Sequence, residues 1–194
     1  MSDVTFSFDL GSPYAWLAAE RVDALLAPRT VVWEPVLLGA VFGATGRSSW
    51  ATQGDAPRTT GMAEVERRAR ERDLPPVVWP DPWPTSYLTA MRVATAVERH
   101  GGQAALRTFA LAALRAAFTD GADLATADGI ALACDRAGLP GATLLIAAGD
   151  QATKDALRAR TDAAIARGVR GVPTFTVDGA VAAFGDDELD ALAA

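Results

Sequence analysis

Hydrophobic and polar positions follow two different periods over the first 35 residues. Residues 4–9 alternate with a period of two, which predicts a β-strand. Apolar side chains then recur at helical spacing over residues 14–26, after Ser12 as a potential N-cap and Pro13 in the first turn, and predict a helix. Residues 30–35 are rich in β-branched and aromatic side chains, which predicts a second strand. The three elements form a β-α-β unit, in which we expect a right-handed crossover and parallel strands.

Helical spacing dominates the middle of the chain. We expect helices there over residues 86–99, 104–118, 126–137 and 141–148. Two other stretches lack a periodic pattern, residues 43–57 and 74–84. The second contains five prolines, which neither a helix interior nor a central strand accommodates, so we expect it to be extended.

The C-terminal part returns to a mixed pattern. A helix is predicted from residue 150 to residue 167, where Gly168 ends it. Residues 174–177 have strong β-propensity, and the Asp-Gly turn that follows predicts a hairpin with residues 180–184. A short helix with acidic residues in its first turn is expected from residue 185.

The order of these elements is β-α-β, a helical insertion, and then α-β-β-α. Few small folds end with a helix, a proline-led hairpin and a helix. We therefore predict an α/β chain with a thioredoxin-like fold split by an all-helical insertion. The thioredoxin-like domain is expected to comprise residues 1–37 and 150–194, and the insertion domain residues 38–149.

Composition and charge narrow the classes of function. Half of the 194 residues are hydrophobic, as in an ordinary globular protein, and the formal net charge is −6. Nucleic-acid binding is not expected, because no basic stripe is present to neutralise phosphates. One cysteine and one histidine argue against a metal site and against a Cys/His nucleophile, and they exclude an intrachain disulfide. The N-terminus lacks a signal-peptide pattern and no stretch is long enough to cross a membrane, so we expect a cytoplasmic protein.

The junction between the first strand and the first helix carries candidate chemistry in Ser12-Pro13-Tyr14-Ala15. Dithiol oxidoreductases of the thioredoxin fold have a Cys-Pro-x-Cys type motif here, and serine and alanine cannot supply the thiolate that disulfide exchange requires. The start of the helix keeps unpaired N–H groups and a partial positive charge, which can stabilise the thiolate of an external molecule. The Ser12 hydroxyl either donates a hydrogen bond to that sulfur or acts only as the N-cap.

A second candidate is the loop before the third strand, Gly171-Val172-Pro173-Thr174. In the thioredoxin fold this proline faces the start of the first helix and follows a cis peptide bond. The Val172 backbone is then free to pair with an extended peptide such as glutathione. Two acidic residues beyond the hairpin, Asp186 and Asp187, either stabilise the start of the last helix or bind the α-ammonium group of a γ-glutamyl residue.

Large aromatic residues and one arginine are candidates for the walls of a substrate pocket. Trp79 and Trp83 lie in the proline-rich stretch, where they either pack on the helices or line a groove. Trp50 and Tyr14 are further candidates for the same pocket. Arg47 is either a solvated loop residue or a cation for a substrate carboxylate.

At these residues the chain resembles the kappa-class glutathione transferases and, within them, the 2-hydroxychromene-2-carboxylate isomerases. The resemblance covers nearly the whole chain and rests on the order and spacing of several segments, namely residues 9–18, 35–42, 86–92, 154–158 and 168–175. The chain departs from the isomerase pattern at Gly43, Gly46-Arg47, Thr85 and residues 183–187.

The resemblance implies a glutathione-dependent isomerase that acts on a small conjugated aromatic acid, with glutathione as cofactor and a homodimeric assembly. Ser12 corresponds to the serine that holds the glutathione sulfur, Pro173 to the cis-proline, and Val172 to the residue that pairs with the glutathione backbone. Asp187, with Asp186, resembles the acidic loop at the γ-glutamyl end. The implied reaction is addition of the thiolate to the conjugated system, rotation about the temporary single bond, and expulsion of the thiol. The alternatives are a kappa-like glutathione transferase and a non-catalytic module that binds a thiol or a peptide.

Overall fold

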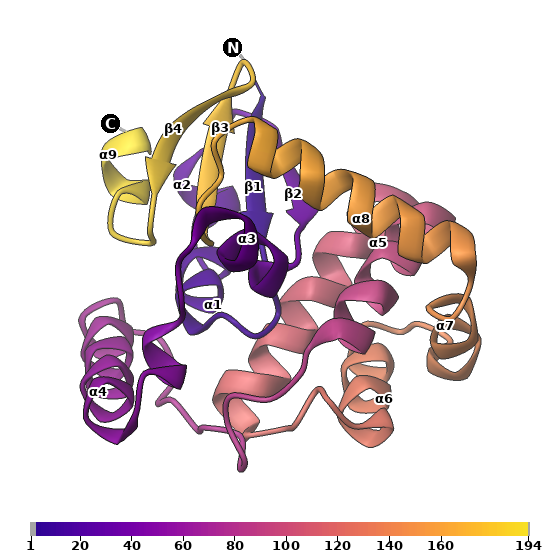
Figure 1. The fold of residues 1–194 in the computed structure, drawn as a ribbon, viewed down its shortest axis with the longest axis horizontal. Helices are drawn as coiled ribbons and strands as arrows, with labels where there is room; N and C mark the ends of the chain where they lie inside the picture. The colour runs from indigo at the N-terminus through magenta and orange to yellow at the C-terminus, as the bar shows by residue number, and fades with distance from the viewer. Residues whose placement is uncertain (1–2, 194) are drawn as a thin grey trace.

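A four-stranded mixed sheet organises the computed structural model, which describes residues 3–193 (Figure 1). The strands are β1 (Val4–Phe8), β2 (Val31–Pro35), β3 (Thr174–Val177) and β4 (Ala180–Phe184), in the spatial order β2-β1-β3-β4. β1 is parallel to β2 and antiparallel to β3, and β3 is antiparallel to β4. The strands lie where the hydrophobic pattern predicts them, in a thioredoxin-like order. Residues 1 and 194, the outer limits of the expected thioredoxin-like domain, lie outside the described residues.

Aromatic side chains in the centre of the sheet hold the strands in register. Phe6 lies opposite Trp33 of β2 and Phe175 of β3, and all three side chains are buried. The ring centroids of Phe6 and Trp33 are 4.9 Å apart, and those of Phe6 and Phe175 are 5.4 Å apart. A shift by one residue would turn these rings to the opposite face, so the buried rings specify the pairing.

The helices cover the sheet and form a second layer beside it. They are α1 (Pro13–Ala19), α2 (Val22–Leu25), α3 (Leu38–Thr45), α4 (Asp55–Glu71), α5 (Leu88–Asp120), α6 (Ala127–Arg136), α7 (Gly141–Ala147), α8 (Gln151–Ala166) and α9 (Leu189–Ala193), with a 3₁₀ turn, η1, at Trp50–Thr52. In Figure 1, α8 passes in front of the sheet and α2 lies behind it. The α5, α6 and α7 helices pack together at one end, and α4 stands at the other.

Tertiary contacts divide the single helix that was expected over residues 14–26. The structure has two helices, α1 and α2, separated at Glu20 and Arg21, where the Arg21 backbone leaves the helical region. The Glu20 carboxylate accepts hydrogen bonds from Arg115 of α5, and Arg21 pairs with Asp190 of α9. The two ion pairs flank the break and lead to different elements, α5 and α9.

The middle of the chain is more helical than its pattern indicates. The stretch expected to be irregular over residues 43–57 includes the end of α3, the η1 turn and the start of α4, so that expectation is wrong at both ends. Pro57 lies in the first turn of α4, where proline costs no helical hydrogen bond. The expected helices over 86–99 and 104–118 are present as the two arms of α5, which bends at Gly102. Residues 74–84 contain neither helix nor strand, as predicted.

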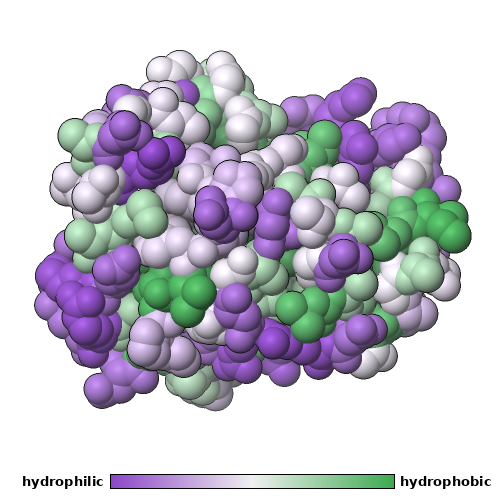
Figure 2. Space-filling view, turned by 90° about the horizontal axis from the view of Figure 1, so that it is seen from below, coloured by the Kyte–Doolittle hydropathy of each residue, from purple (hydrophilic) through white to green (hydrophobic). Residues whose placement is uncertain are grey.

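Seen from below, the surface is hydrophilic at one end, and hydrophobic side chains show in its middle and at the other end (Figure 2). The hydrophilic end lies where Figure 1 places α4, which carries the ion pairs of Arg67 with Glu64 and Glu71. Hydrophobic side chains appear among polar ones between α4 and the α5–α7 layer. Within residues 3–193, no helix has both the length and the apolar character needed to span a membrane.

Candidate functional site

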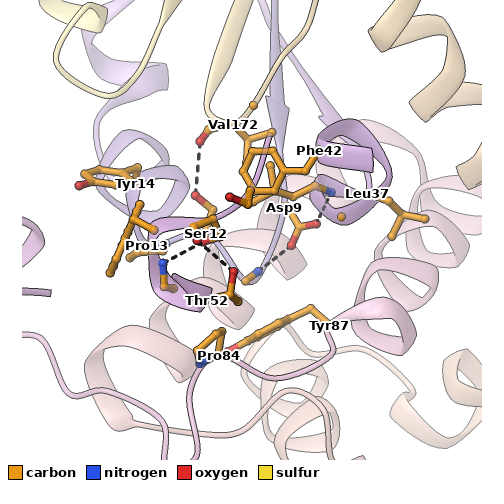
Figure 3. A pocket seen from close by; sticks show the side chains of 18 of the residues that line it. Asp9, Ser12, Pro13, Tyr14, Leu37, Phe42, Thr52, Pro84, Tyr87 and Val172 are labelled. Atoms are coloured by element: carbon orange, nitrogen blue, oxygen red, sulfur yellow. Dashed lines mark hydrogen bonds between the residues drawn. The ribbon is translucent and has the colours of Figure 1, made fainter. Parts of the chain in front are cut away.

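A cavity of about 620 Å³ lies where the β1–α1 junction meets α3, η1 and the start of α5. Six of the residues singled out in the sequence line it, namely Ser12, Tyr14, Arg47, Trp50, Trp83 and Val172. They come from segments far apart in the chain, and the fold brings them together around one space. Figure 3 shows Ser12, Tyr14 and Val172 in this arrangement. The cavity is therefore the candidate functional site.

Ser12 begins α1 and faces the loop before β3. Its buried hydroxyl accepts a hydrogen bond from the Ala15 N–H at 3.2 Å, which is the N-cap contact expected from the sequence. The same hydroxyl donates to the carbonyl oxygen of Val172 at the long distance of 3.5 Å (Figure 3). A weak contact of this length leaves the proton available to a better acceptor in the cavity.

Val172 presents its backbone beside Ser12, and the Val172–Pro173 peptide bond is cis, as expected. No hydrogen bond to the Val172 N–H occurs within the described part of the chain. Pro173 itself is buried, and its carbonyl oxygen accepts from the Gly185 N–H at 2.9 Å. Val172 thus lines the cavity with its carbonyl oxygen beside the Ser12 hydroxyl and with an N–H that has no acceptor in the described part of the chain.

Asp9 fixes the shape of the site, although sequence reasoning did not single it out. Its buried carboxylate accepts from the N–H of Gly11 and from the N–H of Leu38, both at 2.8 Å. Burial raises the pKa of this carboxyl, and the two N–H groups oppose that effect. The side chain ties the β1–α1 junction to the first turn of α3. An aspartate directly after a strand and two residues before a glycine is a signal that could have indicated this local turn.

Asp186 occupies a different place from the one expected for an ammonium-binding residue. Its carboxylate is fully buried, accepts from Arg68 of α4 at 2.8 Å and also pairs with Arg72, the residue directly after α4. Two guanidinium groups already satisfy this charge, so Asp186 joins the loop after β4 to α4 rather than facing a ligand. Asp187 remains 59% exposed and lies 3.4 Å from Arg68.

The aromatic side chains form a row along one wall of the cavity. Tyr14, Trp50 and Trp83 line it, with ring centroids 6.2 Å apart for the first pair and 5.4 Å apart for the second. Trp79 lies outside the lining and packs behind Trp83, at 4.6 Å between centroids, and on Phe118 of α5. Of the two uses foreseen for these tryptophans, Trp83 therefore lines the cavity and Trp79 packs on the helices.

Basic side chains lie in and beside the cavity. Arg47 lines it as an exposed residue, with its guanidinium 5.6 Å from the centre of the Phe184 ring. A smaller hollow of about 270 Å³ shares Leu37 and Leu88 with the main cavity. It is lined by three basic residues, Arg92, Lys154 and Arg158, and by one acidic residue, Asp162.

Cys134, the single cysteine, lies away from the cavity. It is buried on α6, and burial, with a smaller contribution from Asp135, raises the pKa of its thiol to about 11. No group of three or more His, Cys, Asp or Glu side chains that could hold a metal ion occurs among residues 3–193.

Cys134 is expected to be inert in the folded protein. At neutral pH the raised pKa leaves almost no thiolate, and burial blocks access, so a thiol reagent should modify native protein far more slowly than protein unfolded in denaturant. Alanine at this position should leave any thiol chemistry of the cavity unchanged. Rapid modification of native protein would contradict this expectation, and mass spectrometry after timed labelling provides the measurement.

The fold and the cavity define a thioredoxin-fold protein whose first helix begins with serine instead of a redox cysteine. A family model for the DSBA-like thioredoxin domain matches residues 3–194, and the chain belongs to that family. Among solved structures, a 2-hydroxychromene-2-carboxylate isomerase is similar, with 23% sequence identity and a TM-score of 0.84 over 97% of this chain and 91% of the isomerase chain. A probable DsbA oxidoreductase from Streptomyces coelicolor has 18% identity and a TM-score of 0.76, over 100% of this chain and 88% of its own.

These comparisons confirm the predicted fold class and the DsbA-like family. The isomerase named by the sequence resemblance is among the structures that share the fold. At these identities the likeness is one of fold, so the reaction must be argued from the site. No curated sequence matches this chain.

Proposed function

We propose that this protein binds glutathione across Ser12 and Val172 and uses its thiolate for reversible addition to a small conjugated aromatic acid, as a glutathione-dependent isomerase. The observation that carries the proposal is the buried Ser12 hydroxyl. It stands where redox members of the fold have a cysteine, and it faces the cavity. Its hydrogen-bond acceptor, the Val172 carbonyl oxygen, lies at the long distance of 3.5 Å. In the proposed complex the hydroxyl turns from Val172 toward the glutathione sulfur and donates to the thiolate.

The peptide part of glutathione is proposed to pair with Val172. The unpaired N–H of Val172 and its carbonyl oxygen form the kind of strand edge to which an extended peptide adds. The γ-glutamyl ammonium group would then pair with Asp187, which is exposed and has Arg68 at 3.4 Å, whereas Asp186 is fully buried against both Arg68 and Arg72. Pro173 holds the loop through its carbonyl contact with Gly185 and has no polar group of its own to offer a ligand.

The lining of the cavity indicates which class of molecule would accept the thiolate. Tyr14, Trp50 and Trp83 provide flat apolar surfaces, which suit an aromatic or conjugated molecule. An acid is favoured because Arg47 lies at the cavity and further basic side chains surround the adjoining hollow. A homodimer and a cytoplasmic location remain predictions from the sequence.

Titration with glutathione tests the proposal. We expect saturable binding by calorimetry, and we expect the ultraviolet absorbance of the complex to show a thiol pKa well below the value of about 8.5 for a free thiol. Screening of conjugated acids would follow, with geometric isomerisation as the expected outcome and a stable thioether product as the sign of a transferase. Absence of binding, or binding with an unshifted pKa, would exclude thiolate activation and favour a non-catalytic binding module.

A further inference from the structure

The basic hollow beside the main cavity contains cations without partners. Arg92, Lys154 and Arg158 line it, and within residues 3–193 none of them forms an ion pair or donates a side-chain hydrogen bond. A neighbouring arginine of α8 differs in this respect, since Arg160 pairs with Glu98 of α5. Arg92 and Lys154 are moreover half-buried, so they lose part of their hydration without a compensating partner. The hollow is therefore suited to an anion.

Among the described residues, one acidic side chain lines the hollow. Asp162 is exposed and follows Arg158 by one turn of α8, a spacing at which opposite charges attract. The positive charge that remains belongs to Arg92 on α5 and Lys154 on α8. An anion bound here would thus face cations from two different helices.

The start of α3 separates this hollow from the β1–α1 junction. Thr161 of α8 accepts a hydrogen bond from the Leu37 N–H at 3.1 Å. The next residue, Leu38, donates its N–H to Asp9 at 2.8 Å. These contacts hold the hollow and the junction on either side of one short segment. Because Leu37 and Leu88 line both the hollow and the main cavity, one molecule can extend from one space into the other.

The hollow and the aromatic wall lie on opposite sides of Ser12. In Figure 3, Tyr14 lies on one side of Ser12, and Leu37, which also lines the hollow, lies on the other. A molecule that packs a ring on Tyr14 and Trp50 and extends past Ser12 therefore reaches the hollow with its other end. In the same view Asp9 lies between Ser12 and Leu37. Its two oxygens each accept a backbone hydrogen bond, which compensates its charge within the protein.

We propose that the hollow binds the carboxylate of the conjugated acid through Arg92 and Lys154, while the aromatic ring of the same molecule packs on the aromatic wall of the main cavity. This inference rests on the proposed function and adds to it the orientation of the molecule that the thiolate attacks. The reactive double bond then lies beside Ser12, between the ring and the carboxylate. The substrate class is thereby narrowed to acids whose double bond connects an aromatic ring with the acid group.

Binding of trans-cinnamate tests the carboxylate site without any reaction. This probe carries a flat ring and a carboxylate at the two ends of one double bond, and calorimetry in the absence of glutathione measures its affinity. We expect wild-type protein to bind it and added salt to weaken the binding. Arg92→Gln and Lys154→Met should each weaken binding about tenfold, because a charged hydrogen bond to the carboxylate is lost. The matched control Arg99→Gln should not, since Arg99 is an exposed residue of α5 that lines neither space.

Two further ligands define what the hollow recognises. Cinnamamide has the same ring and double bond without the charge, so it should bind equally to wild type, Arg92→Gln and Lys154→Met. Acetate has the charge without the ring, and it should bind at least about tenfold more weakly than cinnamate, because it makes no contact with the aromatic wall. Acetate that binds as tightly as cinnamate would show a general anion site and overturn the assignment to the conjugated acid.

Stability measurements separate this role from a structural one. Arg92 and Lys154 have no ion pair to lose within the described part of the chain, so neither substitution should lower the denaturant midpoint of unfolding. Equal affinity of wild type and both variants for cinnamate, or no binding to wild type, would overturn the carboxylate site.

Calorimetry with glutathione on the same proteins keeps the two proposals distinguishable. Cinnamate binding that depends on Arg92 and Lys154, without any glutathione binding, would refute only the proposed function. Glutathione binding with a lowered thiol pKa, together with cinnamate binding that neither substitution changes, would refute only the carboxylate site.

Discussion

Replacing Ser12 with alanine is expected to raise the thiol pKa of bound glutathione by about 1–2 units, because the thiolate loses a hydrogen bond from the hydroxyl. At a pH below both pKa values the fraction of thiolate should fall about tenfold for each unit of the rise, and turnover should fall with it. Affinity for glutathione should change much less, since the Val172 backbone and the exposed Asp187 are untouched. The ultraviolet absorbance of the complex, followed against pH, measures the shift.

The same substitution removes the N-cap of α1, so a control for stability is required. Thr126 caps α6 in the same way, with its hydroxyl accepting from the Gly129 N–H at 3.1 Å, and it does not line the cavity. Thr126→Ala and Ser12→Ala should each lower the free energy of unfolding by about 1 kcal/mol. Only Ser12→Ala should move the thiol pKa, and an unchanged pKa in that variant would refute the role of Ser12.

Alanine at Asp186 is expected to cause a large loss of stability, whereas alanine at Asp187 is not. Asp186 is fully buried between Arg68 and Arg72, and its removal takes the carboxylate from Arg72 and leaves Arg68 with Glu64 and Asp187 alone. We expect the free energy of unfolding to fall by about 3 kcal/mol. Asp187 is exposed, so its removal should change stability by no more than about 0.5 kcal/mol. Denaturant unfolding of both variants provides the comparison.

Asp187→Ala, which should barely change stability, should weaken the binding of glutathione. If its carboxylate binds the γ-glutamyl ammonium group, Asp187→Ala should weaken binding by about tenfold, which corresponds to one charged hydrogen bond. Titration with a glutathione analogue that lacks the ammonium group gives the control, because wild type and Asp187→Ala should bind it equally. Unchanged affinity of Asp187→Ala for glutathione itself would show that Asp187 does not bind the ammonium group.

Local patterns were sufficient to predict the framework of the site. The period of two over residues 4–9, the Asp-Gly turn and the proline-led strand each depend on residues adjacent in the chain, and the structure places β1, β3 and β4 accordingly. Ser12 was found because an N-cap and the residues after it form a signal within four positions. The break between α1 and α2 was missed, because the ion pairs of Glu20 and Arg21 lead to residues 95 and 169 positions away.

Local patterns thus established the order of the four strands, the serine at the start of the first helix, and the lack of a second cysteine that excludes dithiol chemistry. Contacts between distant segments were needed to show that Asp187, and not Asp186, is exposed to a ligand. Asp186 and Asp187 are neighbours in the chain, yet one is buried by arginines more than 100 positions away and the other is exposed. The tertiary structure also decided that Trp83 and Tyr87 meet in the wall of the cavity. Such contacts depend on packing between distant segments, which leaves no periodic pattern in the sequence.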